Sequence, residues 1–249
     1  PWSTDQQLGA GIFLTALPEG RHRIDLLAKD SAGYWQEAAD FTSSREWQVD
    51  PSAPIALLLN EVEANSAPGI DSVELHNPSN GARSLKGWSL TDNPNKPNKR
   101  PLSGTIGAGS FRTFSARDVP GLSARGETLF LFQGNTLVDI ITWGLQAPGF
   151  SIGRVGPEAN WSLTIPSPNL ANQRSGLAPV RDLKINEWLA EADVRYAGEF
   201  VELYNPGDSP AALGGLGISD SPDHPFQHQL REHTYLEPGG FLVLWATGL

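Results

Sequence analysis

The sequence predicts an all-β protein built from tandem β-sandwich domains. The first observation is a long internal repeat. Its motifs in the first copy are Asn60-Glu61, Val73–Pro78 and Leu85–Asp92, and in the second copy they are Asn186-Glu187, Val201–Pro206 and Leu213–Asp220. The second observation is the composition, since 26 Gly and 20 Pro in 249 residues suit many short strands joined by turns. The third is that no window combines a sustained 3.6-residue apolar period with helix caps. Copies offset by 126 to 128 residues are long enough for each to bury a core of its own.

Three segments follow from the repeat. Residues 1–54 are predicted to hold the last strands of a separate β-domain and a linker. Residues 55–172 are predicted to form a complete sandwich, and residues 173–249 a linker with an incomplete second sandwich. In the first segment strands are expected at 12–14, 21–28 and 47–50, before the linker at 51–54. In the complete sandwich they are expected at 55–62, 72–77, 85–91, 111–114, 128–132, 136–143 and 161–163.

Alternating apolar residues within these strands define a predicted core. Its members are Leu75, Leu85, Trp88, Leu90, Leu129 and Leu131. Both ends of the chain are expected to be incomplete. Because Gly239-Gly240-Phe241 aligns with Gly109-Ser110-Phe111, about 53 residues of the second copy are expected to be missing. They would include the counterparts of the strands at 128–132 and 136–143.

The composition and charge exclude several classes of protein. Hydrophobic residues make up 39% of the chain, which indicates a folded protein, and no apolar run approaches the ~18 residues of a transmembrane helix. With 0 Cys, the chain has no disulfide, thiolate metal site or cysteine nucleophile, and the lack of Met as well favours an extracytoplasmic setting. The net charge of −10 argues against nucleic-acid binding. We expect the basic cluster of Lys96, Lys99 and Arg100 to be a solvated loop.

The repeated motifs resemble the lamin tail domain family. The resemblance also rests on the two Gly-led motifs above and on an ending that runs through Ser151–Arg154, Trp161 and Pro166–Asn172. It covers residues 55–172 and most of 180–249, and it implies immunoglobulin-like β-sandwiches with no catalytic residues. The first 54 residues are similar to the end of a bacterial immunoglobulin-like domain. The resemblance further implies large secreted or surface proteins of bacteria, some of which also carry a catalytic domain.

One motif matches a hydrolase signature. Gly149–Gly153 has the G-x-S-x-G pattern of a nucleophile elbow, in which Ser151 would sit between a strand and a helix. Gly156 and Pro157 follow too closely for such a helix. We therefore expect a tight turn around Ser151, with no histidine bonded to its hydroxyl.

Metal ligation is an alternative for two loops. The histidines His224, His228 and His233 lie close together in the sequence, although we expect a polar loop there rather than a metal site. Calcium is the better alternative, because carboxylates gather in such turns, and its candidate ligands are Asp92, Asp220 and Asp223. Capping of the turn backbone explains these aspartates equally well.

Repeated carboxylates and tryptophans have structural explanations. Glu74 and Glu202 are expected to bond across the sheet to the Asn-Glu strand, since acid–base catalysis would require a second carboxylate, Glu61 or Glu187, across a cleft. Trp88, Trp143 and Trp161 are expected in the core rather than on a sugar-binding face.

The sequence therefore favours a non-catalytic structural or interaction segment of a large extracellular or cell-surface bacterial protein, serving in spacing, adhesion or assembly. No cofactor is expected, and the partners would be other domains of the same longer chain or neighbouring protein subunits. One alternative is an accessory region of a secreted enzyme whose catalytic domain lies outside these residues. Another is a carbohydrate- or calcium-binding module.

Overall fold

The computed structural model describes residues 17–29, 34–37, 39–50, 57–66, 69–190 and 198–246. The chain divides into two compact units, Pro1–Pro54 and Ile55–Leu249. Within the described ranges the regular elements are strands apart from two 3₁₀ turns, η1 (Ala116–Asp118) and η2 (Val180–Asp182), which confirms the predicted all-β class. None of the helices in these ranges is long and apolar enough to cross a membrane.

The first unit contains two short antiparallel pairs. Its strands are β1 (Gly20–His22), β2 (Asp25–Leu26), β3 (Thr42–Ser43) and β4 (Trp47–Val49). β1 pairs with β4 and β2 with β3. The strand expected at 21–28 is thus divided between β1 and β2. The strand expected at 12–14 and the linker at 51–54 lie outside the described residues.

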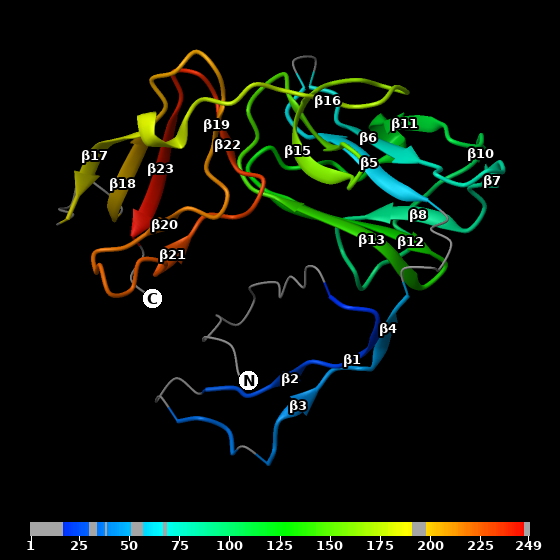
Figure 1. The fold of residues 1–249 in the computed structure, drawn as a ribbon, viewed down its shortest axis with the longest axis horizontal. Helices are drawn as coiled ribbons and strands as arrows, with labels where there is room; N and C mark the ends of the chain where they lie inside the picture. The colour runs from blue at the N-terminus through cyan, green and yellow to red at the C-terminus, as the bar shows by residue number, and fades with distance from the viewer. Residues whose placement is uncertain are drawn as a thin grey trace. The chain divides into compact units, whose positions relative to one another are not determined.

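The second unit begins with a sandwich, here named the first sandwich (residues 57–174; Figure 1). One sheet has the order β11-β6-β5-β14-β15-β16. Its strands are β5 (Leu58–Glu63), β6 (Ser72–His76), β11 (Phe111–Ser115), β14 (Ser151–Val155), β15 (Asn160–Ile165) and β16 (Gln173–Arg174). The other sheet, β13-β12-β8-β9, consists of β8 (Trp88–Thr91), β9 (Arg100–Pro101), β12 (Glu127–Gln133) and β13 (Thr136–Trp143). A short pair joins β7 (Arg83–Ser84) to β10 (Thr105–Ile106).

The core of the first sandwich lies between these sheets. All six predicted core residues belong to it: Trp88 is 3% exposed and the five leucines are 0% exposed. Leu75 comes from β6 in one sheet and Leu131 from β12 in the other, so the cluster packs between the two sheets and stabilises their association. The predicted core is confirmed.

The remainder of the second unit is the C-terminal segment (residues 177–246). Its strands are β17 (Lys184–Leu189), β18 (Glu199–Tyr204), β19 (Ala211–Ala212), β20 (Gly217–Ile218), β21 (His228–Gln229), β22 (Tyr235–Leu236) and β23 (Phe241–Ala246). β17, β18 and β23 form a sheet, while β19 pairs with β22 and β20 with β21 (Figure 1). A smaller apolar cluster packs among these strands: Ala178, Leu203, Ala211, Leu213, Leu230 and Leu236.

Strand pairing in the C-terminal segment matches that in the first sandwich. The register of β5 and β6 shifts around Asn60, and the register of β17 and β18 shifts around Asn186, so each copy has an irregularity at the same asparagine. The pairs β18–β23, β19–β22 and β20–β21 likewise correspond to β6–β11, β7–β10 and β8–β9.

Candidate functional site

Asparagine–glutamate pairs, buried in the first copy and exposed in the second, stabilise the strand irregularity in both copies. Asn60 donates from its side chain to Glu74 over 2.9 Å, and Asn186 donates to Glu202 over 2.7 Å. Residues at an irregularity leave the regular ladder, so a side-chain partner on the adjacent strand fixes their position. The predicted structural role of these two glutamates is confirmed by their bonds to the Asn-Glu strand. Glu74 also accepts from Thr113 Oγ1 over 2.8 Å.

A second asparagine in each copy holds the turn that follows its strand. Asn77 donates from its side chain to the carbonyls of Gly81 and Gly107, each over 2.8 Å. Asn205 makes the corresponding bonds to Ser209 over 2.9 Å and Glu237 over 3.0 Å. Both side chains are essentially buried. Sequence reasoning treated the Asn-Pro pairs only as strand ends, although their repetition pointed to this role.

Glu61 lies beside Glu74 in the sheet, not across a cleft from it. It accepts from Ser151 Oγ over 2.6 Å and from the Ser167 backbone over 3.2 Å. Burial raises the pKa of Glu61, while these two hydrogen bonds lower it. The neighbouring Glu74 charge raises the pKa further but contributes less. This carboxylate is 6% exposed and anchors strands and a loop, whereas a catalytic base needs access to its substrate.

The tight turn expected around Ser151 is wrong. Ser151 is the first residue of β14 and is 0% exposed, and the turn ends earlier, at Gly149 with φ 74°. Its hydroxyl bonds to Glu61 and Thr164, and no histidine is among its partners in the described part of the chain. A serine in mid-sheet, bonded to a carboxylate, lacks the exposed strand-to-helix position of a nucleophile elbow.

A partly buried ion pair joins the two sheets of the first sandwich. Arg154 on β14 contacts Asp139 on β13 over 3.0 Å and donates to the Leu59 carbonyl over 2.8 Å. The Leu59 amide donates to the same aspartate over 2.9 Å. Burial raises the pKa of Asp139, and the guanidinium lowers it. Arg154 also lies 4.6 Å from the ring centre of Trp161, a cation–π contact.

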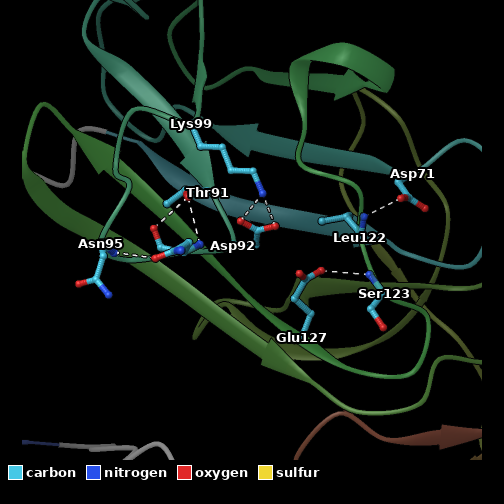
Figure 2. Close-up of polar contacts among 9 residues, drawn as sticks. Asp71, Thr91, Asp92, Asn95, Lys99, Leu122, Ser123 and Glu127 are labelled. Atoms are coloured by element: carbon cyan, nitrogen blue, oxygen red, sulfur yellow. Dashed lines mark hydrogen bonds and ion pairs between the residues drawn. The ribbon is translucent and has the colours of Figure 1, made fainter.

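The carboxylate of Asp92 is paired with a cation of its own loop. Lys99 lies 2.6 Å from both carboxylate oxygens of Asp92 (Figure 2). Nearby, Glu127 accepts from the Ser123 backbone over 3.0 Å, and burial raises its pKa. Together with Asn93, Pro94 and Lys96, these side chains line an open depression of about 500 Å³. Calcium at Asp92 would have to displace the lysine, and it stays a prediction.

The other metal candidates are spread over the C-terminal segment. Asp220, Asp223 and His224 lie in the exposed loop between β20 and β21, and His228 is on β21. His233 lies apart from them, with φ 54° and a backbone carbonyl that accepts from Gln146. Among the residues that the structure describes, no three His, Cys, Asp or Glu side chains are grouped to hold a metal ion.

The tryptophans fall into two classes. Trp88 and Trp143 are buried in the core as expected, whereas Trp161, also expected there, is only half-buried and packs against the core with Arg154 over its ring. Trp188 on β17 and Trp245 on β23 are instead 69% and 53% exposed. Sequence reasoning did not single out either residue.

The C-terminal segment is joined to the first sandwich by a contact here named the joint (residues 144–146, 173–178 and 231–236). The Tyr235 amide donates to the Leu145 carbonyl over 2.7 Å, and Gln146 Nε2 donates to the His233 carbonyl over 2.7 Å. Tyr235 is 5% exposed and belongs to the core cluster of the first sandwich. Burial raises the pKa of its hydroxyl to about 12, although a hydrogen bond with the Leu163 backbone lowers it.

The joint is close-packed and its linker is bonded at both ends. A Cβ on Gly144 would lie 2.0 Å from Thr234 Oγ1, so only glycine fits there. After β16, Ser175 donates to Leu163 of the first sandwich over 2.9 Å. Ala178 then donates to Pro210 of the C-terminal segment over 2.8 Å. The linker thus has little freedom to bend.

A comparison with known protein families finds a match in the C-terminal segment. Residues 177–248 match the family model of the lamin tail domain. The match covers less than a third of the chain, so it supports one lamin tail domain, which lies in the second copy of the repeat. For residues 55–172 and 1–54, the family assignments stay predictions. No curated protein and no solved structure matches the chain.

Proposed function

We propose that the chain is a non-catalytic spacer and interaction segment of a large secreted or surface bacterial protein. In this proposal two lamin-tail-like modules follow a terminal piece of an immunoglobulin-like domain. The lamin tail domain is a family of non-catalytic immunoglobulin-like modules, and its match at residues 177–248 supports such a role. The matching strand pairs and asparagine bonds support the tandem arrangement.

The joint is the observation that carries the proposal. A flexible connection between modules is usually polar, rich in Gly and Ser, and free of hydrogen bonds to either side. Here the linker is bonded to both modules, and Tyr235 is buried in the core of its neighbour. Such a connection holds two modules at a fixed distance and angle, which is what a spacer requires.

The hydrogen-bond partners of the buried and partly buried carboxylates support a non-catalytic role. Glu61, Glu74 and Asp139 each bond to strands or loops of the sandwich framework. A catalytic carboxylate needs a path to substrate and a partner group across a cleft. The alternative of accessory modules in a secreted enzyme places chemistry in a domain outside these residues, and it is compatible with the same joint.

Distance measurements between spin labels test the proposal. Because the chain has 0 Cys, the pair Lys86→Cys and Asp208→Cys places one label on each module without background labelling. The control pair, Lys86→Cys and Glu158→Cys, lies within the first sandwich. All three sites are exposed. We expect the inter-module distribution to be as narrow as the control, whereas a broad distribution would refute a rigid spacer.

Ligand screens separate the remaining alternatives. We expect calorimetry with Ca²⁺ to show no saturable heat, since Lys99 already neutralises Asp92 and the other candidates are dispersed. We also expect no hit on a glycan array. Saturable binding in either assay would favour a binding module over a spacer.

A further inference from the structure

A lysine, an aspartate and a glutamate come together at one end of the first sandwich (Figure 2). Asp92 follows the last residue of β8, Lys99 precedes the first residue of β9, and Glu127 begins β12. All three line the open depression described above. Glu127 stands opposite Trp143 and two residues before Leu129, and both of these are 0% exposed. The amine and the two carboxyl groups thus share one partly buried site at the end of the core.

The amine of Lys99 is within attacking distance of the Asp92 carboxyl carbon. Its Nζ lies 2.6 Å from each of the two carboxylate oxygens, which is shorter than the roughly 2.7–2.9 Å of an ordinary charged pair. Because Cγ lies between those oxygens, the nitrogen is within about 3 Å of it, which is the range of near-attack geometry. The side chains of Lys99 and Asp92 are 37% and 19% exposed, so water only partly surrounds the pair.

The loop between these two residues is held by hydrogen bonds of its own. Thr91 Oγ1 accepts from the Asn93 amide over 3.0 Å, and Asn93 Oδ1 accepts from the Asn95 amide over 3.0 Å (Figure 2). Ser89 Oγ donates to the Pro97 carbonyl over 2.6 Å. Groups held in this way react as if each were present at an effective concentration on the order of 10⁵ M or more. Amide formation between them can therefore occur even though water surrounds the protein.

We propose that Lys99 and Asp92 form an amide bond, with Glu127 transferring the protons. The ammonium first gives a proton to the aspartate, and the neutral amine then attacks Cγ. As the Cγ–Nζ bond forms, Glu127 gives its proton to the departing hydroxyl and takes one from the nitrogen. The Cγ–O bond breaks and one water leaves. Nothing is oxidised or reduced, and no other reactant is needed.

The surroundings of Glu127 suit this proton transfer. Burial raises the pKa of Glu127, and the charges of Asp92 and Lys99 have smaller effects of opposite sign on it. A raised pKa increases the protonated fraction of the carboxyl group, and that form can donate to a leaving hydroxyl.

The second copy lacks the nucleophile. Asp220 stands at the place of Asp92, but Gln227 stands at the place of Lys99. The same offset of 128 residues relates β9 to β21. An amide side chain has no amine to attack a carboxyl group, so the crosslink belongs to the first sandwich alone. With 0 Cys the chain cannot close a loop by a disulfide, and this bond would close one by other means.

Mass spectrometry of the whole chain tests the crosslink. After denaturation, the chain should be lighter by one water than the 26.8 kDa of its sequence. Trypsin cleaves after Lys99 only when its amine is free. An uncrosslinked chain therefore yields the peptides 87–99 and 100–112, whereas the crosslinked chain should yield the single peptide 87–112, lighter by one water.

Three variants assign the roles of the groups. Lys99→Arg should abolish the loss of water, because a guanidinium stays protonated and does not attack. Lys96→Arg is the matched control, since Lys96 lines the same depression and should leave the crosslink intact. Glu127→Gln should slow the reaction at least about tenfold, which would appear as uncrosslinked chain.

Three results would overturn the proposal. The first is the full sequence mass for the folded wild-type chain, together with separate peptides 87–99 and 100–112. The second is a loss of water that persists in Lys99→Arg, because it would then arise elsewhere in the chain. The third is an unchanged crosslinked fraction in Glu127→Gln, which would leave the proton transfer without its group. The crosslink lies within one module, so it does not depend on the rigid spacer proposed above.

Discussion

Replacing Tyr235 by alanine should uncouple the C-terminal segment from the first sandwich. The ring is 5% exposed and lies in a core that belongs to the other module. Truncating a large buried aromatic side chain costs about 3–5 kcal/mol, from lost burial and the cavity that remains. The backbone bond from residue 235 to Leu145 does not depend on the side chain, so the loss reports the ring and its hydroxyl.

Two further variants separate the contributions of the ring and the hydroxyl to the free energy lost in Tyr235→Ala. Tyr235→Phe keeps the ring and removes only the hydroxyl bond to Leu163, so it should cost about 1 kcal/mol. Thr105, the residue at the corresponding place in the first copy, is exposed, and Thr105→Ala should cost less than about 0.5 kcal/mol. The order of destabilisation is therefore alanine at 235, phenylalanine at 235, and then alanine at 105.

The assay is urea denaturation followed by tryptophan fluorescence. The wild-type second unit should unfold in one cooperative transition, and Tyr235→Ala should split it, with the C-terminal segment unfolding first.

Stability at alkaline pH is an independent measure of the contribution of the Tyr235 hydroxyl. The pKa of the Tyr235 hydroxyl in the folded protein is about 12, above its ordinary value of about 10. The stability that the neutral hydroxyl contributes is therefore present below pH ~10 and is lost as the pH rises through 12. Tyr235→Phe should lack this loss. A single unchanged transition for Tyr235→Ala, or a cost no larger than that of Tyr235→Phe, would show that the joint does not couple the modules.

Three further predictions concern the two modules. Trp88→Ala should lower the free energy of unfolding by about 3–5 kcal/mol in the same denaturation assay, and a change under about 1 kcal/mol would contradict the core assignment. Gly144→Ala should broaden the inter-module spin-label distances, because its Cβ would meet Thr234, while an unchanged distribution would contradict the close packing. For Glu61 the folded pKa is raised, so its stabilisation relative to Glu61→Gln should be complete below pH ~4 and fall as pH rises through the folded pKa. Urea midpoints of both proteins across this range measure the difference, and a rise with pH would contradict the assignment.

The sequence predicted those parts of the fold that depend on local pattern. Trp88 and its neighbours alternate in short runs between turn residues, and this pattern led to the correct core. The strand β14 was missed because its residues are typical of turns. Position 153 requires glycine because of a contact distant in the sequence, since a Cβ there would lie 2.6 Å from the Asn172 side chain. Ser151 is small and polar because it meets a buried carboxylate.

The joint could not be predicted from the repeat. Tyr235 occupies a place whose counterpart in the first copy, Thr105, is exposed, so comparison of the copies indicated no special role. The ion pair of Asp139 with Arg154 was also missed, because its partners come from different sheets and nothing in their local sequence links them. The bond between Asn60 and Glu74, by contrast, can be predicted from the sequence, because both copies retain the two residues.

Hydrogen exchange at the Tyr235 amide tests the rigid joint most directly. This amide donates to Leu145 across the junction, and Leu131 provides a reference amide in the core of the first sandwich. If the modules are held as one body, both amides should exchange only through the same cooperative unfolding and give the same free energy of opening. Exchange at Tyr235 with a free energy several kcal/mol below that of Leu131 would mean that the joint opens locally, which contradicts the rigid spacer.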